Sequence, residues 1–414
     1  MKAPLHILLV IALTFGTGPS AAFERPETNG HDLSNAFREP LLHPSFGNRV
    51  VRQGIPTSPF AIDHPAEHAY YDGLYAGHYN ANMTGEQEID QSQLPSATDP
   101  DGHPLWYDGR RQSEFLGTII GWLYVHQQYD DLDRLFNDWN DSHERLADGR
   151  WRLVAFHNAM AGSFRSDWQQ ALDDVRHWRE AKPQSRAAIL TEALYWHQYA
   201  WHARGAGAAN SVTPEAWSLF RERLLKADTL LRETKPLIGS SPLWGRLSLE
   251  VALGLDVPRE QMLETFVEAS KDGPVYSPHY TAMANALTPR WGGSWELVDQ
   301  FVRAAVARTA ATEGSALYAR IYWTLREQHP DTFELFRDSR ANWPDMKRGY
   351  EDMMRPYPHS AAVVNEFAAT ACMANDKETF RALRLKLGKA ITRESWPTNH
   401  SLDLCDHSLG PAAL

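Results

Sequence analysis

The spacing of apolar residues from about Phe115 onward is that of amphipathic helices. In "FLGTIIGWLYVHQQYDDLDRLFNDWNDSHERL" the apolar groups recur every three or four residues, which places them on one face of a helix. No segment shows a convincing alternation of apolar and polar residues, so no strand is predicted. Further helices are predicted over residues 151–162, 167–180, 185–203, 214–233, 242–253, 258–271, 276–287, 295–309, 315–328, 331–340, 344–355, 361–374 and 377–387. The predicted fold class is therefore all-α.

The ends of these helices indicate how they are connected. Proline stands in the first turn of several of them, where its missing N–H costs nothing, at Pro214, Pro242, Pro258 and Pro344. The connecting loops are short, and short loops make consecutive helices antiparallel neighbours. The helices should therefore stack in sequence order.

A weak repeat is also visible. The second helix of a tetratricopeptide unit carries an aromatic residue, a small residue three positions later and a proline at the end of the unit. Three segments show parts of this pattern, namely Phe266 with Ala269 and Pro274, Phe301 with Ala304, and Tyr350 with Pro358. Because the intervals are uneven, the pattern predicts a degenerate helical-hairpin, tetratricopeptide-like solenoid rather than a regular array.

The chain begins "MKAPLHILLVIALTFGTGPSAAF", with an early lysine, a short apolar run and small residues ending at Ala21 and Ala22. This order is typical of a secretory signal peptide, and the apolar run is too short to span a bilayer. The predicted division is a signal peptide at 1–22, an irregular proline-rich N-terminal arm at 23–110, a helical-repeat domain at 111–390 and a C-terminal tail at 391–414. A periplasmic or secreted protein with no membrane span after cleavage follows.

Composition narrows the classes of partner. The formal net charge of −11 argues against a nucleic-acid binder, which needs a basic face to displace counterions from phosphates. The chain also has 15 tryptophans, an excess that fits either sugar-stacking surfaces or helices packed through large side chains.

The stretch "TPRWGGSWE" at 288–296 has two interpretations. As a corner, Pro289 ends a helix, Gly292 or Gly293 adopts the left-handed conformation, and Ser294 caps the next helix. As a binding site, successive backbone N–H groups at Gly292, Gly293 and Ser294 form an anion nest, with charge from Arg290 and a stacking face from Trp291. Either way, Arg290 should lie at an inter-helix corner, with Trp291 mostly buried there.

Two aromatic helices offer further candidates. In "SALYARIYWTL" Arg320 lies near the face opposite Tyr318 and Tyr322, and it either meets Arg290 in a shared groove or belongs to a solvated face. In "LYWHQYAWHARGAG" the spacing of five between His197 and His202 does not suit a helical metal pair, which favours a packed aromatic helix. No G-x-S-x-G or H-E-x-x-H motif occurs, so no catalytic residue, metal site or cofactor is predicted.

The two cysteines, Cys372 and Cys405, are an even number in a chain predicted to reach an oxidising compartment. A disulfide between them is predicted, which requires their Cα atoms to lie within about 7 Å. The alternative is two unpaired thiols, with Cys372 a small core residue.

Five blocks, "DGRWRL" at 148–153, "YAWHARGAG" at 199–207, "PRWGGS" at 289–294, "YARIYW" at 318–323 and "FAATAC" at 367–372, together resemble a bacterial domain-of-unknown-function family, the one numbered 4034. The resemblance implies a tetratricopeptide-like helical array and brings no established catalytic residues. The first hypothesis is a secreted or periplasmic protein that binds a protein, peptide or cell-wall glycan. The second is an all-α toroid enzyme, a polysaccharide lyase or glycoside hydrolase, which would place a Tyr or His beside carboxylates.

Overall fold

The structure is a computed structural model of the 414-residue chain. It describes residues 109–410 except 165–166, 208, 272–274, 331, 359 and 389. The predicted signal peptide and nearly all of the predicted N-terminal arm therefore lie outside the described residues. Within the described part, regular secondary structure is helical apart from isolated bridge residues, which confirms the all-α fold class.

Contacts between Cα atoms divide the chain into two compact units. The described part of the first unit comprises residues 114–144 and 151–349, and that of the second comprises 109–113, 145–150 and 350–410. The helices of the first unit are α4 (Gly109–Val125), α5 (Tyr129–Ser142), α6 (Leu153–Ser163), α7 (Trp168–Ala181), α8 (Arg186–Arg204), α9 (Pro214–Glu233), α10 (Lys235–Ile238), α11 (Pro242–Gly254), α12 (Arg259–Ser270), α13 (Ser277–Ala286), α14 (Trp295–Glu313), α15 (Ala316–Glu327), α16 (Leu335–Asp338) and most of α17 (Trp343–Met354).

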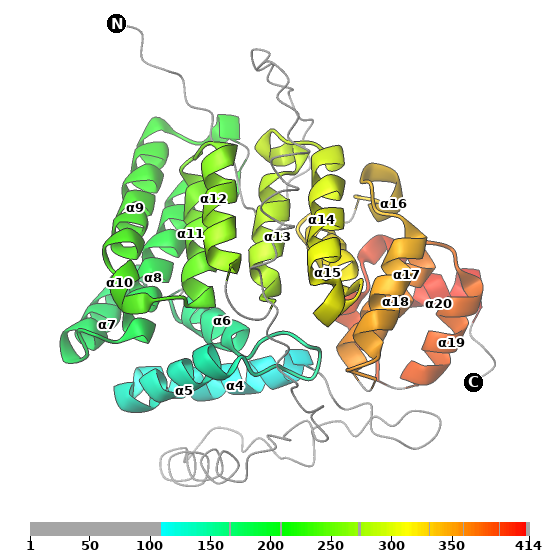
Figure 1. Ribbon diagram of the computed structural model, residues 1–414, viewed down its shortest axis with the longest axis horizontal. Coiled ribbons are helices and arrows are strands. Elements are labelled where there is room, and N and C mark those ends of the chain that lie inside the picture. Colours follow the sequence, from blue (N-terminus) through cyan, green and yellow to red (C-terminus); the bar gives the residue numbers. More distant parts are fainter. Residues whose placement is uncertain are drawn as a thin grey trace, which may run out of the picture. The chain divides into compact units, whose positions relative to one another are not determined.

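The first unit is built from helical hairpins in two rows. One row consists of α8, α11, α13 and α15, each packed against the next. The second row contains α9, α12 and α14, and each of these packs against the first-row helices that precede and follow it in the chain. Figure 1 shows α9, α11, α12, α13 and α14 side by side in sequence order. This is the arrangement expected of a helical-hairpin solenoid.

Two aromatic positions of the repeat pattern, Phe266 and Phe301, lie in the core of this stack. Phe266 and Phe301 are both fully buried, and their rings meet edge to face with centroids 5.3 Å apart. Phe266 also contacts Tyr280 of α13 in the same way at 5.1 Å. Close approach of the helices requires a small residue opposite, because a Cβ added at Gly245 of α11 would lie 2.5 Å from that of Ala269.

Most helix boundaries agree with the sequence pattern because local signals fix them. The helices at Pro214–Glu233 and Lys377–Leu387 have the predicted bounds. Thr213 and Asp376 cap their first turns by accepting hydrogen bonds from backbone N–H groups. The prediction for 331–340 was too long, since only Leu335–Asp338 is helical.

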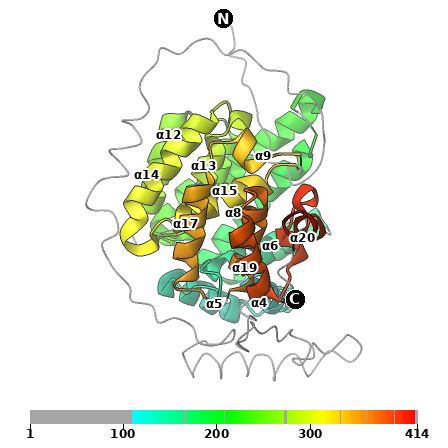
Figure 2. The ribbon, with the colours of Figure 1, turned by 90° about the vertical axis from the view of Figure 1, so that its right-hand side faces the viewer.

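The second unit contains α18 (Ala361–Met373), α19 (Lys377–Leu387), the 3₁₀ turns Arg393–Ser395 and Thr398–His400, and α20 (Leu402–Leu409). Helices α18 and α19 form a hairpin, and α20 contacts both of them; Figure 2 shows α19 and α20 together. Asn365 of α18 accepts from the indole N–H of Trp396 at 3.1 Å. The segment after α19 is thus held against the hairpin.

A disulfide joins the C-terminal segment to α18. It links Cys372 to Cys405, whose Cα atoms lie 5.9 Å apart, inside the distance predicted for this pair. Cys405 is almost fully buried, as is Leu409 one helical turn later. The bond and this apolar face together fix α20.

Among the described helices, none combines the length and the hydropathy that crossing a bilayer would require.

Candidate functional site

The "TPRWGGSWE" stretch forms a tight corner between α13 and α14. The 3₁₀ turn Pro289–Trp291 is closed by Gly292 in the left-handed conformation, with φ of 71°. Gly293 is packed so closely that an added Cβ would lie 2.0 Å from the carbonyl oxygen of Leu287. Ser294 then caps α14 by accepting from the N–H of Leu297. The corner interpretation is therefore confirmed for the backbone.

The backbone hydrogen bonds of the corner contradict the part of the anion-nest hypothesis that concerns Gly292 and Gly293. The N–H of Gly292 donates to the carbonyl of Pro289, and that of Gly293 donates to the carbonyl of Thr288, both at 3.0 Å. The hydroxyl of Ser294 is occupied by its cap. Because both glycine N–H groups are used inside the corner, neither is available to a bound anion.

The side chains of Arg290 and Trp291 take no part in the hydrogen bonds that close the backbone of the corner. Trp291 is 8% exposed, as predicted, and its indole N–H is buried without a hydrogen-bond partner in the described part of the chain. Arg290 is half-buried, and this burial lowers the pKa of its guanidinium. Within the described residues no acceptor or carboxylate pairs with Arg290. The corner thus holds a partly desolvated cation that has no counter-charge among the described residues.

A second arginine, Arg204 at the end of α8, lies within electrostatic reach of Arg290. It is only 3% exposed. Its Nη1 donates to the carbonyls of Gly205 and Gly207 at 2.8 and 2.6 Å, while its Nε and Nη2 are buried with no partner among the described residues. Burial and the charge of Arg290 lower the pKa of Arg204 to about 10, so the group remains cationic at neutral pH.

The face of α8 that carries Arg204 leads directly to the corner. His197, Trp201 and Arg204 lie at positions i, i+4 and i+7, which share one side of a helix. The indole N–H of Trp201 donates to Nε2 of His197 at 3.0 Å. The ring of Trp201 meets that of Trp291 edge to face, with centroids 6.5 Å apart.

A third basic group comes from the segment that follows α15. Burial lowers the pKa of His329, and the charges of Arg290 and Arg326 lower it further. Its Nδ1 is hydrogen-bonded to the carbonyl of Leu325 at 2.6 Å. We call the set of Trp201, Arg204, Arg290, Trp291 and His329 the basic corner.

Arg320, the other arginine predicted for this region, is half-buried on α15. The shared groove between Arg290 and Arg320 stays a prediction.

A cluster of polar side chains lies next to the basic corner, around α11. Arg246 and Glu250 form an ion pair at 2.9 Å, with their side chains 20% and 17% exposed. His157 of α6 and His197 of α8 are each 4% exposed, and their electrostatic influence reaches Glu250. We call these residues, with Tyr276 at the start of α13, the histidine cluster.

The charges of the histidine cluster follow from its burial. Burial by itself would raise the pKa of Glu250, but Arg246 and the two imidazoles lower it to about 2. Burial lowers the pKa of His157 well below its usual range and also lowers that of His197. At neutral pH the cluster therefore contains a carboxylate, a guanidinium and two uncharged imidazoles. Nδ1 of each imidazole is buried without a partner in the described structure.

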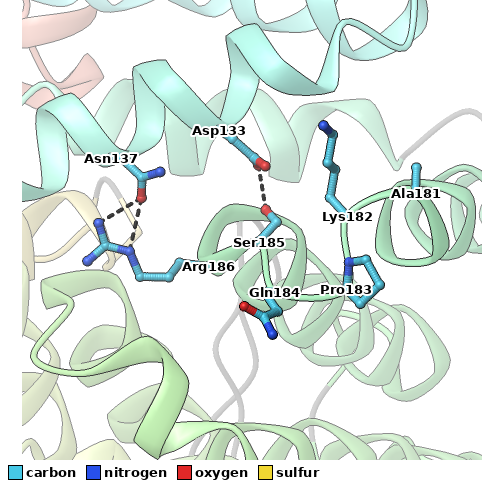
Figure 3. A pocket seen from close by; sticks show the side chains of 8 residues that line it. All are labelled: Asp133, Asn137, Ala181, Lys182, Pro183, Gln184, Ser185 and Arg186. Carbon is cyan, nitrogen blue, oxygen red and sulfur yellow. Dashed lines mark hydrogen bonds between the residues drawn. The ribbon is translucent and has the colours of Figure 1, made fainter.

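An open cavity of about 420 Å³ lies elsewhere in the first unit, between α5 and the loop that leads into α8 (Figure 3). Its polar side chains bind one another, as Ser185 donates to Asp133 and Arg186 donates to Asn137 at 2.9 and 2.7 Å. Because these groups already have partners, the cavity lacks the unsatisfied donors found at the basic corner.

The sequence identified two of the five residues of the basic corner as candidates. Arg290 and Trp291 were candidates, whereas Arg204, His329 and the histidine cluster were not. The sequence signal that could have identified Arg204 is its position on one helix face with His197 and Trp201, at i, i+4 and i+7. No local pattern could bring the ends of α8, α13 and α15 together.

Residues 119–223 match a family described as "Domain of unknown function (DUF4034)". The match confirms the resemblance over that segment and includes the blocks at 148–153 and 199–207. The blocks at 289–294, 318–323 and 367–372 lie beyond it. Neither a curated protein nor a solved structure matches the chain. His157, His197, Trp201 and Arg204 all fall inside the matched segment.

Proposed function

We propose that the protein binds an anionic group of a protein, peptide or cell-wall glycan at the basic corner. Residues 119–223, which match the DUF4034 family, include Trp201 and Arg204 of this corner. We place it in the periplasm or outside the cell. The signal-like start of the chain and the disulfide between Cys372 and Cys405 support that location. Its net charge of −11 supports a partner other than nucleic acid.

The observation that carries the proposal is the unused edge of Arg204. Its Nε and Nη2 are the two parallel donors that bind both oxygens of a carboxylate, phosphate or sulfate at once. Both are buried with no partner among the described residues. An unpaired buried charge is costly, and a bound anion would remove that cost. Arg290 lies near enough to lower the pKa of Arg204, so it would add attraction for the same anion.

A purely structural role explains less. Arginine near a helix C-terminus commonly binds the last carbonyls, and Nη1 of Arg204 does so with Gly205 and Gly207. That role leaves Nε and Nη2 unused, and it gives no reason for placing Arg290 beside them. Two cations held together without a described carboxylate partner fit an anion site better than a helix cap.

The proposal is tested by calorimetric titration of the folded protein with glucuronate, acetate, phosphate and sulfate. We expect saturable binding of at least one anion, weakened by added salt. Arg204→Gln and Arg290→Gln should each weaken it about 10- to 100-fold, the range for a hydrogen bond to a charged group. Arg337→Gln is the matched control, because Arg337 is exposed on α16 and pairs with Asp338. Absence of saturable binding, or equal affinities in all variants, would show the proposal to be wrong.

A second candidate function is a polysaccharide-cleaving enzyme. The observation that favours it is the histidine cluster, which places two imidazoles and Tyr276 around the Arg246–Glu250 pair. Neutral histidines beside a carboxylate are suited to moving protons. Incubation with uronic-acid polysaccharides and with peptidoglycan tests it. Cleavage products that form with the wild type and not with Glu250→Gln would support an enzyme. If the wild type leaves the polymers intact, the enzyme hypothesis is wrong and the binding function stands alone.

A further inference from the structure

The imidazoles of His157 and His197 lack hydrogen bonds that buried polar groups normally make. In His197, Nε2 accepts from Trp201, so the ring proton of the neutral form resides on Nδ1 and has no acceptor in the described structure. Nδ1 of His157 is likewise buried and unsatisfied there. A buried polar group that is left without a partner destabilises the folded protein. Two of them close to one ion pair indicate that something else completes the cluster.

The chemistry of the missing group follows from the charges around it. Glu250 already supplies a carboxylate and Arg246 a guanidinium, so neither sign of charge is lacking. The Nδ1–H of His197 needs an acceptor, and Nδ1 of His157 is a donor or an acceptor according to its tautomer, so a group that is both donor and acceptor suits both rings. A hydroxyl has this property. The described residues contain no group of three or more His, Cys, Asp or Glu side chains that could hold a metal ion.

The distance between the histidine cluster and the basic corner sets the size of the ligand. His197 and Arg204 are seven residues apart on one face of α8, which is about 10 Å along the axis at 1.5 Å per residue. Trp201 lies between them and is half-buried, so its indole offers an apolar surface along the way. A single small anion cannot reach both ends of this stripe, whereas a chain of sugar rings can.

We infer that the ligand is an acidic oligosaccharide whose carboxylate binds Arg204 and Arg290 and whose neighbouring hydroxyls bind His157 and His197. The inference rests on the proposed function and adds the ligand class to it. An acidic peptide would satisfy the basic corner equally well. A sugar chain fits His157, His197 and Trp201 better than a peptide does, because it presents hydroxyls to the neutral imidazoles and an apolar ring face to the indole.

The experiment compares four probes by calorimetry with the full-length processed protein: galacturonate, trigalacturonate, maltotriose and triglutamate. Galacturonate carries the charge without the chain, maltotriose carries the sugar chain without the charge, and triglutamate is an acidic peptide. We expect trigalacturonate to bind at least 10-fold more tightly than galacturonate and triglutamate, and maltotriose to bind most weakly. This comparison needs no variant, so it stands even if a substitution prevents folding.

Variants then locate the extra affinity. His157→Phe should lower the affinity for trigalacturonate about 10-fold and leave that for galacturonate unchanged, while His157→Gln, which keeps a donor and an acceptor, should restore part of the loss. His407→Phe is the matched control, because His407 is exposed on α20. Equal binding of trigalacturonate and galacturonate, or of trigalacturonate and triglutamate, would overturn the inference while the proposed anion site stands. Failure of all three anionic probes to bind would overturn the inference, and failure of phosphate and sulfate as well would overturn the proposed anion site with it.

Discussion

Replacing Gly245 with alanine should destabilise the protein, although the same change stabilises most helices. Gly245 lies inside α11, where alanine is favoured over glycine by about 1 kcal/mol. The new Cβ, however, would lie 2.5 Å from Cβ of Ala269 and 2.7 Å from Nε2 of His279. Neighbours in ordinary van der Waals contact are about 1 Å farther away. Helices α12 and α13 would therefore have to move apart from α11.

The magnitude follows from three contributions. Overpacking of a core typically costs about 1–3 kcal/mol. The hydrogen bond between Nε2 of His279 and the carbonyl of Pro242, 2.6 Å long and buried, would be strained or lost, at about 1–3 kcal/mol. The gain in helix propensity of about 1 kcal/mol opposes them. The expected net loss is about 1–5 kcal/mol in the free energy of unfolding.

The measurement is urea unfolding followed by circular dichroism, with the disulfide intact. The control is Gly121→Ala in α4, since a Cβ added there would meet no atom within 4 Å. That variant should gain about 0.5–1 kcal/mol. The two substitutions are chemically identical and should shift the unfolding midpoint in opposite directions. A midpoint for Gly245→Ala at or above that of the wild type would refute the close approach of these helices.

One chemical reduction and two substitutions test the disulfide, a buried histidine and a helix cap. Reducing the Cys372–Cys405 bond should lower stability by about 3–4 kcal/mol, because its ends are 33 positions apart in sequence, and equal unfolding midpoints with and without reductant would contradict this. Burial lowers the pKa of His279 to about 4, so the neutral ring favours the folded state and its contribution should be lost as pH falls from 6.5 to 4. The loss should be about 3 kcal/mol and should vanish in His279→Gln, and unfolding curves of both proteins across that range check it. Asp376→Ala removes the cap of α19 and should cost about 1 kcal/mol in thermal unfolding, while an unchanged melting temperature would show that the cap contributes little.

The candidate site shows where sequence reasoning stops. Arg290 and Trp291 could be selected because a corner explains the glycines and the serine around them but assigns no role to an arginine and a tryptophan. Arg204 could not be selected in the same way, since an arginine before a helix-ending glycine has an ordinary local role. Its importance depends on which of its nitrogen atoms lack partners, and this is a property of the packed structure.

Local physics determined the elements of this protein. Apolar spacing, proline in first turns and capping residues act within a few positions, so the helix at 377–387 could be bounded from its sequence alone. At 331–340 the same signals were weaker, and only four residues became helical. Tertiary structure alone decided that Trp201 of α8 contacts Trp291 after α13, that Arg204 and His329 lie within electrostatic reach of Arg290, and that two imidazoles lie within electrostatic reach of Glu250. These groups are distant in sequence and meet because hairpins stack to bury their apolar faces, a requirement that fixes which helices are neighbours without leaving a local pattern.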